Sequence, residues 1–273
     1  MTRSASAAAS SSAVSQRLIL GMPVVDLGWA NAFAFASEAV SRGSGQVRLA
    51  FLNANNANLM MKDAEYREVL RRQIVFPDGH GVDIASYLFH GCMFPANLNG
   101  TDFVPALLTY IEPPMRVAMI GARPDVLARA AENFRKHAPW HEFLPVSDGF
   151  FDRRRSREVL ADVRAQKADI LLVAMGSPMQ EKWVDAYVGP QDARLVITVG
   201  ALFDFVAQEF PRAPKLLRRL RLEWFYRLAM EPKRMWRRYV LGNPLFLLHV
   251  FLHKLTGRAR KSVGSASLGA RKC

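Results

Sequence analysis

A regular alternation of short apolar runs and amphipathic stretches between residues 47 and 205 is the feature that most constrains the fold. Runs with no polar alternation are typical of strands that are buried on both faces, and intervening helices are typical of a parallel sheet. The sequence therefore predicts an α/β fold with a mostly parallel sheet and helices on both faces. The expected strands occupy residues 47–53, 74–76, 115–120, 143–146, 169–174 and 195–199.

The loops that follow these strands are the expected ligand site, because open α/β sheets bind ligands beyond the carboxyl ends of their strands. The helices after the loops are expected at residues 58–73, 82–89, 102–111, 124–137, 157–166 and 180–188. Five of the six loops contain glycine, including Gly121, Gly149 and Gly176. Glycine lets the backbone approach a phosphate, and a helix N-terminus offers free N–H groups to it. Glycine after a strand is also ordinary turn chemistry, but the clustering at one edge favours a nucleotide site.

The net charge of +13 is concentrated in the C-terminal fifth of the chain. Residues 212–261 contain 14 Lys and Arg against two acidic residues, whereas residues 1–211 contain 21 basic and 22 acidic residues. We therefore expect a disordered leader (1–16), a globular domain (17–210), a basic helical appendage (211–261) and a disordered tail (262–273). The leader lacks the long apolar core of a signal peptide. The two cysteines, Cys92 and Cys273, are far apart in the sequence, so a cysteine-based zinc site is not expected.

The appendage combines apolar and basic helix faces. Helical stretches are expected at residues 215–229, 232–241 and 244–255, and one face of the first carries Leu216, Leu217, Leu220, Trp224 and Leu228. Such helices, with Trp and Tyr among the arginines, can lie on an anionic membrane surface. The same pattern also suits helices packed on the sheet with solvated arginines, or a surface that binds nucleic acid. No stretch reaches the roughly 18 apolar residues that span a bilayer.

Several blocks of the chain together resemble a known family. They read LNANNANLMMKDAEYREVL, FPDGHGVDIA, LNGTDFVPALL, GARP, SDGFF, LLVAMGSPMQEKW, VGALFDF and RAPKLLRRLRLEWFYRLAMEPKRMWRRY, in that order. Over about residues 20–250 they are similar to the WecG/TagA/CpsF glycosyltransferases (glycosyltransferase family 26). The resemblance implies a Rossmann-like catalytic domain at 17–210 and an appendage that helps to close the active site.

The resemblance also implies the reaction. It indicates an inverting transfer of a sugar from a UDP-sugar donor to a sugar on polyprenyl diphosphate, as in bacterial cell-surface polysaccharide biosynthesis. It implies no metal and no cofactor. We therefore expect a cytoplasmic protein that is bound peripherally to the inner face of the cell membrane, with an anionic membrane surface as a partner and no nucleic acid.

Asp78 is the candidate catalytic base. An inverting transfer needs a group that takes the proton from the acceptor hydroxyl, and Asp78 matches the aspartate proposed for that role in the family. It stands in an exposed turn between Pro77 and Gly79, although Asp-Gly is also ordinary turn chemistry. Asn53 matches a family asparagine near the acceptor, and its alternative role is to cap the helix that follows.

The Gly-Ser-Pro-Met-Gln-Glu segment supplies the candidate donor ligands. Gly176 and Ser177 offer donors to uracil, ribose or phosphate, and Gln180 is placed to reach the donor sugar. Glu181 fits either a binding role or the first turn of a helix, where the helix dipole favours an acid. Gly121 and Gly149 are the candidate glycines of the nucleotide loops, and Phe150 or Phe151 could contact the base, although core packing is the commoner fate of Phe.

Arginines are expected to neutralise the leaving diphosphate. The chain has no Asp-x-Asp pair to hold a divalent metal, and guanidinium groups bind phosphate with bidentate geometry. Arg227, Arg234 and Arg237 match appendage arginines implicated in the family, and the candidate set is completed by Arg212. We assign Arg238 instead to the membrane surface, together with Arg218, Arg219 and Arg221.

Two departures from the family pattern keep other functions open. Phe51 stands where many members have Thr, and Asn97 stands where many have Arg, so the acceptor or donor could differ or activity could be lost. The alternative function is a basic protein without catalysis that binds membranes or nucleic acid. A dinucleotide-dependent oxidoreductase fits poorly, because no glycine loop has the spacing G-x-G-x-x-G.

Overall fold

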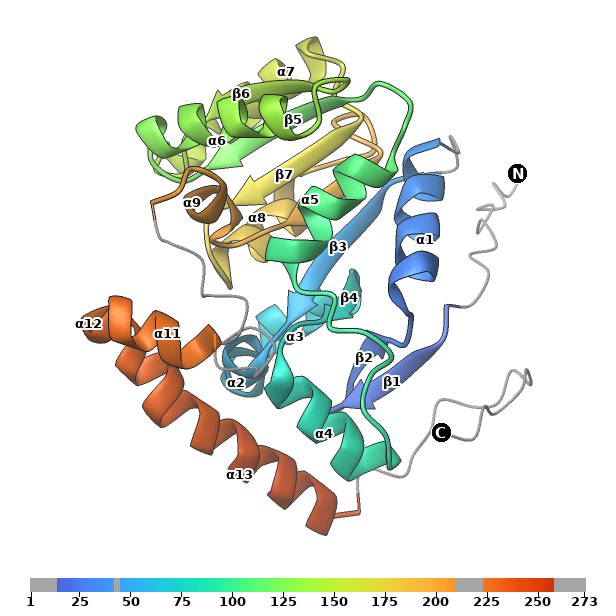
Figure 1. The fold of residues 1–273 in the computed structure, drawn as a ribbon, viewed down its shortest axis with the longest axis vertical. Coiled ribbons are helices and arrows are strands. Elements are labelled where there is room, and N and C mark those ends of the chain that lie inside the picture. The colour runs from blue at the N-terminus through green and yellow to red at the C-terminus, as the bar shows by residue number, and fades with distance from the viewer. Residues whose placement is uncertain (1–13, 42–44, 210–222, 258–273) are drawn as a thin grey trace, which may run out of the picture.

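The computed structural model of the chain describes residues 14–41, 45–209 and 223–257 (Figure 1). Its centre is a six-stranded sheet in the order β4-β3-β8-β7-β5-β6, in which every neighbouring pair is parallel. The strands are β3 (Val47–Leu52), β4 (Ile74–Pro77), β5 (Arg116–Gly121), β6 (Glu142–Ser147), β7 (Ile170–Ala174) and β8 (Leu195–Thr198). Each strand coincides with an expected apolar run, so the predicted α/β fold is confirmed.

Alternate side chains of the strands enter two cores, one on each face of the sheet. Leu49 and Phe51 of β3 point into the first core, which is covered by α1 (Trp29–Ser41), α5 (Gly100–Tyr110), α6 (Pro124–His137) and α9 (Leu202–Val206). Ala50 and Leu52 point to the opposite face. That face is covered by α2 (Ala54–Lys62), α3 (Ala64–Arg71), α4 (His80–His90), α7 (Ser156–Ala165) and α8 (Met179–Tyr187).

The single helix expected at residues 58–73 is two helices, α2 and α3. The break lies at Asp63, whose backbone is extended and whose side chain accepts a hydrogen bond from the Tyr66 N–H. This bond caps α3, and it satisfies an amide that the first turn of a helix would otherwise leave unpaired. The chain therefore changes direction at Asp63, although the apolar periodicity continues on both sides of it.

The N-terminal part contains an unexpected hairpin, β1 (Gln16–Ile19) and β2 (Met22–Val25). Its turn residues Leu20 and Gly21 both have positive φ, 52° and 78°. Such a two-residue turn matches the twist of antiparallel strands. Gln16, the last residue of the expected leader, already belongs to β1. Residues 1–13 of that leader and the expected tail at 262–273 lie outside the described residues.

The described part of the appendage consists of α11 (Glu223–Met230), α12 (Pro232–Trp236), the π-helical turn η2 (Arg237–Leu241) and α13 (Gly242–Leu255). Helix α13 lies along α2 and α4 (Figure 1). Phe246 and Val250 are buried there, and Asn58 Nδ2 donates to the Gly242 carbonyl at 2.7 Å. The other face of α13 exposes Leu247, Leu248, Phe251, Leu252 and Leu255. Within the described residues, no helix is long and apolar enough to cross a membrane.

Candidate active site

A cavity of about 720 Å³ lies at the carboxyl end of the sheet and is lined by residues that follow all six strands. This is the end at which open α/β sheets bind ligands. The wall contains seven of the candidate catalytic and substrate-binding residues, namely Asn53, Asp78, Gly149, Gly176, Ser177, Gln180 and Glu181, and it also contains Phe150 and Phe151, the candidate contacts of the base. The α5 segment adds Gly100 and Thr101, and the appendage adds Arg238.

Asp78 and Asn53 form a pair on the cavity wall. Asn53 Nδ2 donates a hydrogen bond to Asp78 Oδ2 at 3.0 Å, while Asn53 Oδ1 accepts the Asn56 N–H at 3.0 Å. The two functions considered for Asn53, helix capping and a role in the site, therefore coexist in one side chain. Because α2 fixes the amide, the amide in turn orients the carboxylate of Asp78.

The turn that carries Asp78 is held from two sides. The Asp78 N–H donates to the Leu52 carbonyl at 2.9 Å, and the Gly79 N–H donates to Asn97 Oδ1 at 2.8 Å. Gly79 has φ 92° and ψ 163°, a conformation that side chains disfavour. Asn97, at the position where the resemblance led us to expect an arginine, thus ties the residue after Asp78 to the segment that precedes α5.

The second departure, Phe51, also lies at this end of the cavity. Its ring is 6% exposed and stands edge-on to Phe76, with centroids 6.1 Å apart. A Cβ added to Gly100 would lie 3.0 Å from the ring. Gly100 therefore accommodates the aromatic ring at this position.

Gln180 connects two strand ends across the cavity floor. Its Oε1 accepts hydrogen bonds from the Gly176 N–H and the Gly200 N–H, both at 3.1 Å. Its Nε2 donates to Glu181 Oε1 at 2.8 Å, and the side chain is 2% exposed. The Gly176 amide, which we expected to face a ligand, is thus bound by Gln180, and the loops after β7 and β8 are joined into one wall.

Glu181 is 1% exposed within this wall. Ser177 Oγ donates to Glu181 Oε1 at 2.7 Å, whereas Oε2 has no hydrogen-bond partner. Burial raises the pKa of the Glu181 carboxyl above its ordinary value, and the hydrogen bonds from Gln180 and Ser177 act in the opposite direction. The hydroxyl of Tyr66 is buried near Ser177, and burial and the nearby Glu181 charge raise its pKa. The geometry therefore gives Glu181 a part in the internal network of the loop.

The glycines after β5 and β6 permit close packing of neighbouring loops. Gly121 has φ 133°, and a side chain there would overlap the backbone of Ala174. A Cβ on Gly149 would lie 3.0 Å from the Ala122 nitrogen, and the Gly149 N–H donates to the Ala122 carbonyl at 2.8 Å. Gly149 lines the cavity, whereas Gly121 is not among its lining residues.

The appendage arginines are placed unequally. Arg212 lies outside the described residues, as do the side chains of Arg227 and Arg234, whose backbones belong to α11 and α12. Arg237 is exposed, and its guanidinium lies 5.7 Å from the centre of the Trp236 ring. Arg238, which we assigned to the membrane, lines the cavity instead.

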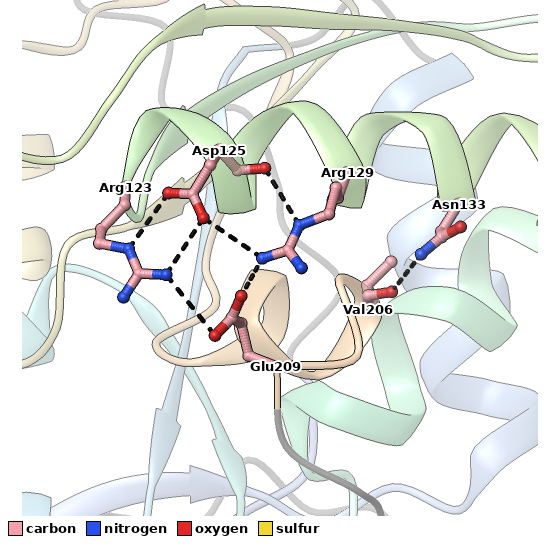
Figure 2. A network of polar contacts seen from close by, with 6 residues as sticks. All are labelled: Arg123, Asp125, Arg129, Asn133, Val206 and Glu209. Carbon is pink, nitrogen blue, oxygen red and sulfur yellow. Dashed lines mark hydrogen bonds and ion pairs between the residues drawn. The ribbon is translucent and has the colours of Figure 1, made fainter.

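Sequence reasoning missed two guanidinium groups of the cavity, Arg123 and Arg153. Arg123 precedes α6 and is bound to Asp125 and Glu209, in a network that also includes Arg129 (Figure 2). Arg153 belongs to a three-residue turn, Arg153–Arg155, which precedes α7. Three consecutive arginines are usually a solvated surface, and no local signal separates Arg153 from its neighbours.

The comparisons with known proteins agree with this architecture. The model of the Glycosyl transferase WecG/TagA/CpsF family matches residues 17–260. Two similar proteins are each named N-acetylglucosaminyldiphosphoundecaprenol N-acetyl-beta-D-mannosaminyltransferase. The relative from Bacillus spizizenii is 32% identical over 196 residues, which cover 71% of this chain and 74% of the relative. The relative from Bacillus subtilis is 31% identical over 201 residues, which cover 73% and 77%.

These matches confirm the resemblance that the sequence blocks indicate. The family match includes every strand of the sheet, the cavity loops and the described part of the appendage. The chain therefore belongs to the WecG/TagA/CpsF family of glycosyl transferases.

Proposed function

We propose that the protein transfers a sugar from a UDP-sugar to a sugar carried on polyprenyl diphosphate, with inversion of the anomeric centre, in bacterial cell-surface polysaccharide biosynthesis. The observation that carries the proposal is the Asn53–Asp78 pair on the wall of the 720 Å³ cavity. Small-molecule sites have volumes of roughly 300–1,000 Å³. The names of the two Bacillus relatives support the acceptor class, a sugar on undecaprenyl diphosphate.

Asp78 is the base in the step that we propose. Its carboxylate takes the proton of the acceptor hydroxyl while that oxygen attacks the anomeric carbon of the donor. The bond from the anomeric carbon to the diphosphate breaks, and UDP leaves with the electron pair. One displacement of this kind inverts the anomeric centre, and a positioned base contributes about 10²–10⁴-fold to its rate.

The position of Asp78 suits this role. The residue stands two positions before His80, the first residue of α4, and the helix dipole carries partial positive charge at this end that favours a carboxylate. Asn53 binds one carboxylate oxygen and thereby limits the rotation of the side chain. A base that is held in one orientation loses less entropy when the substrate reaches it.

We further propose that α13 and its neighbouring helices rest on an anionic membrane at the cytoplasmic face. The outward face of α13 carries five exposed apolar side chains, and α11, α12 and η2 add Phe225, Met230, Trp236, Val240 and Leu241. Apolar patches of this kind mark an interaction site. The basic segment 212–261 supplies the attraction to anionic lipid, and a lipid-linked acceptor brings the reaction to the same surface.

A transfer assay tests the proposed function. The purified full-length protein is mixed with polyprenyl-diphosphate N-acetylglucosamine and, in turn, with UDP-hexoses and UDP-N-acetylhexosamines. Mass spectrometry of the lipid should show extension by one sugar with at least one donor, and NMR of the product should show an inverted anomeric centre. Absence of extension with every UDP-sugar, although the protein binds anionic vesicles or RNA, would favour the alternative of a binding protein without catalysis.

A further inference from the structure

We propose that Arg153 and Phe150 form the nucleotide end of the cavity, where Arg153 binds the donor diphosphate and Phe150 stacks on the base. This inference rests on the proposed function, because it takes a nucleotide sugar as the donor. In this proposal the UDP leaving group is bound by a loop of the catalytic domain, the loop after β6. Arginines of the appendage can bind the diphosphate in addition.

The contacts of Arg153 leave its charge without a negative partner among the described residues. Its Nη1 donates to Met175 Sδ at 3.1 Å, and its Nη2 donates to Met179 Sδ and to the Gly149 carbonyl, both at 3.1 Å. Thioether sulfur is a weak acceptor. A phosphate that displaces the sulfur atoms therefore gains charge-assisted hydrogen bonds at little cost.

Arg123, the neighbouring guanidinium on the cavity wall, shows the opposite arrangement. Its Nε and Nη2 donate to the two carboxylate oxygens of Asp125 at 3.1 Å, and its Nη2 lies 3.5 Å from Glu209 Oε2 (Figure 2). Arg129 contacts the same two carboxylates. Arg123 is thus neutralised by the protein, whereas Arg153 still has a charge to offer to a ligand.

Arg153 is also held in place before any ligand binds. Its guanidinium lies over the Phe151 ring, 4.6 Å from the centroid, and that ring packs edge-on against Trp183. Trp183 Nε1 donates to Ser156 Oγ at 2.9 Å, and Ser156 Oγ donates to the Arg153 carbonyl at 2.6 Å. Both the backbone and the head group of Arg153 are therefore fixed, which reduces the entropy lost on binding.

Phe150 is presented to the cavity by the same loop. It lines the cavity although its side chain is 76% exposed, the largest exposed fraction among the large apolar residues of the described chain. Its N–H donates to Asp148 Oδ1 at 2.7 Å, and the preceding Gly149 is packed against Ala122. A fixed backbone with an exposed ring is a suitable platform for a base, and stacking of this kind is worth roughly 1–3 kcal/mol per base.

The order of the strands separates this end of the cavity from Asp78. Asp78 follows β4, and Phe150 and Arg153 follow β6, which are the two edge strands of the sheet. Arg153 reaches inward to Met175 and Met179, which come after β7. Since β7 and β4 are three strand spacings apart, roughly 14 Å, a donor can lie across the sheet with its base at Phe150, its diphosphate at Arg153 and its sugar at Asp78.

Binding of uridine and UDP to the full-length protein, measured by titration calorimetry, tests the inference. We expect Arg153→Gln to weaken UDP about tenfold or more and to leave uridine within about threefold, because only UDP carries the phosphates. Phe150→Ala should weaken both ligands by a similar factor of about ten. Arg155→Gln is the matched control and should change UDP affinity less than threefold, because the Arg155 guanidinium pairs with Glu158 and does not line the cavity.

Arg153→Lys and Phe150→Tyr test whether any loss comes from misfolding. The tyrosine variant should bind like the wild type, and the lysine variant should fall between wild type and Arg153→Gln. Wild-type affinity for UDP in Arg153→Gln would overturn the assignment of Arg153 while the proposed donor stands. Failure of the wild type to bind UDP would overturn the proposed donor and this inference together.

Discussion

The substitution Glu181→Gln tests whether ionisation of the buried Glu181 carboxyl lowers the stability of the protein. The wild-type carboxyl is 1% exposed, with two hydrogen bonds to Oε1 and no partner for Oε2. Glutamine has nearly the same shape, and its Oε1 can accept the same two bonds from Ser177 and Gln180. The variant therefore removes the ability to ionise and leaves the packing in place.

The direction in which stability changes with pH follows from the raised pKa of Glu181. In the unfolded chain the carboxyl ionises near its ordinary value of 4.5, whereas burial raises its pKa in the folded protein. Between these two values the folded protein holds more protons than the unfolded chain, so its free energy of unfolding falls as pH rises. The glutamine amide is as incompletely paired as the carboxyl but carries no charge, and an incompletely paired buried group costs about 1–3 kcal/mol, more when it is charged. For domains of 150–250 residues the melting temperature changes by about 2–4 °C per kcal/mol. We therefore expect the melting temperature of the wild type, relative to that of Glu181→Gln, to fall by an amount on the order of 5 °C between pH 4.5 and pH 8.

Thermal unfolding followed by circular dichroism from pH 4.5 to pH 8 measures this difference. The melting temperature of the wild type should fall relative to that of Glu181→Gln as the pH rises. Glu158→Gln is the matched control, because the Glu158 side chain is 68% exposed on α7 and pairs with Arg155. Its curve should run parallel to that of the wild type. Parallel curves for Glu181→Gln and wild type would refute the reasoning, because they would show no extra proton on the folded protein.

The other predictions concern the Asp78 turn, the appendage and metal ions. Asn97→Ala removes the acceptor for the Gly79 N–H, so kcat should fall about tenfold while UDP affinity is retained; an unchanged kcat would show that the turn does not need Asn97. Phe246→Ala should cost about 3–5 kcal/mol of stability, because the ring is 1% exposed on the inner face of α13, and an unchanged melting temperature would contradict this docking. Phe251→Ala, on the outer face of α13, should keep stability and weaken flotation with anionic vesicles; full flotation would count against the membrane face. EDTA should leave the transfer rate unchanged, since we assign the diphosphate charge to guanidinium groups, and a loss restored by Mg²⁺ would contradict that assignment.

The sheet could be predicted from the sequence because its strands are apolar on both faces. The run at 169–174, for example, became β7 (Ile170–Ala174), all of whose residues are buried. The break between α2 and α3 was missed because the apolar spacing continues through it. Asp63, followed three residues later by the amide that it caps, was the local signal. The hairpin of β1 and β2 was also missed, and its local sequence signal was Gly21, a residue that readily adopts the positive φ of the turn.

The sequence predicts those parts of the candidate site that consist of residues directly after a strand. Asp78 and Asn53 come directly after β4 and β3, which are neighbours in the sheet, so their meeting follows from the topology. The contacts of Arg153 do not, because Met175 and Met179 are 22 and 26 residues away from it. The burial of Gln180 and Glu181 likewise depends on how the loops after β7 and β8 pack together. The local sequence does not predict such contacts, because they depend on how distant segments pack together.

The central claim is that the cavity transfers a sugar with Asp78 as base, and the kcat of Asp78→Asn tests it most directly. The amide cannot take the acceptor proton, yet it retains the size of the carboxylate. In the transfer assay with the donor that the wild type uses, we predict a loss of kcat of about 10²–10⁴-fold. UDP affinity should be unchanged, because Asp78 lies at the other end of the cavity. A variant that transfers sugar within about threefold of the wild-type kcat would contradict the account.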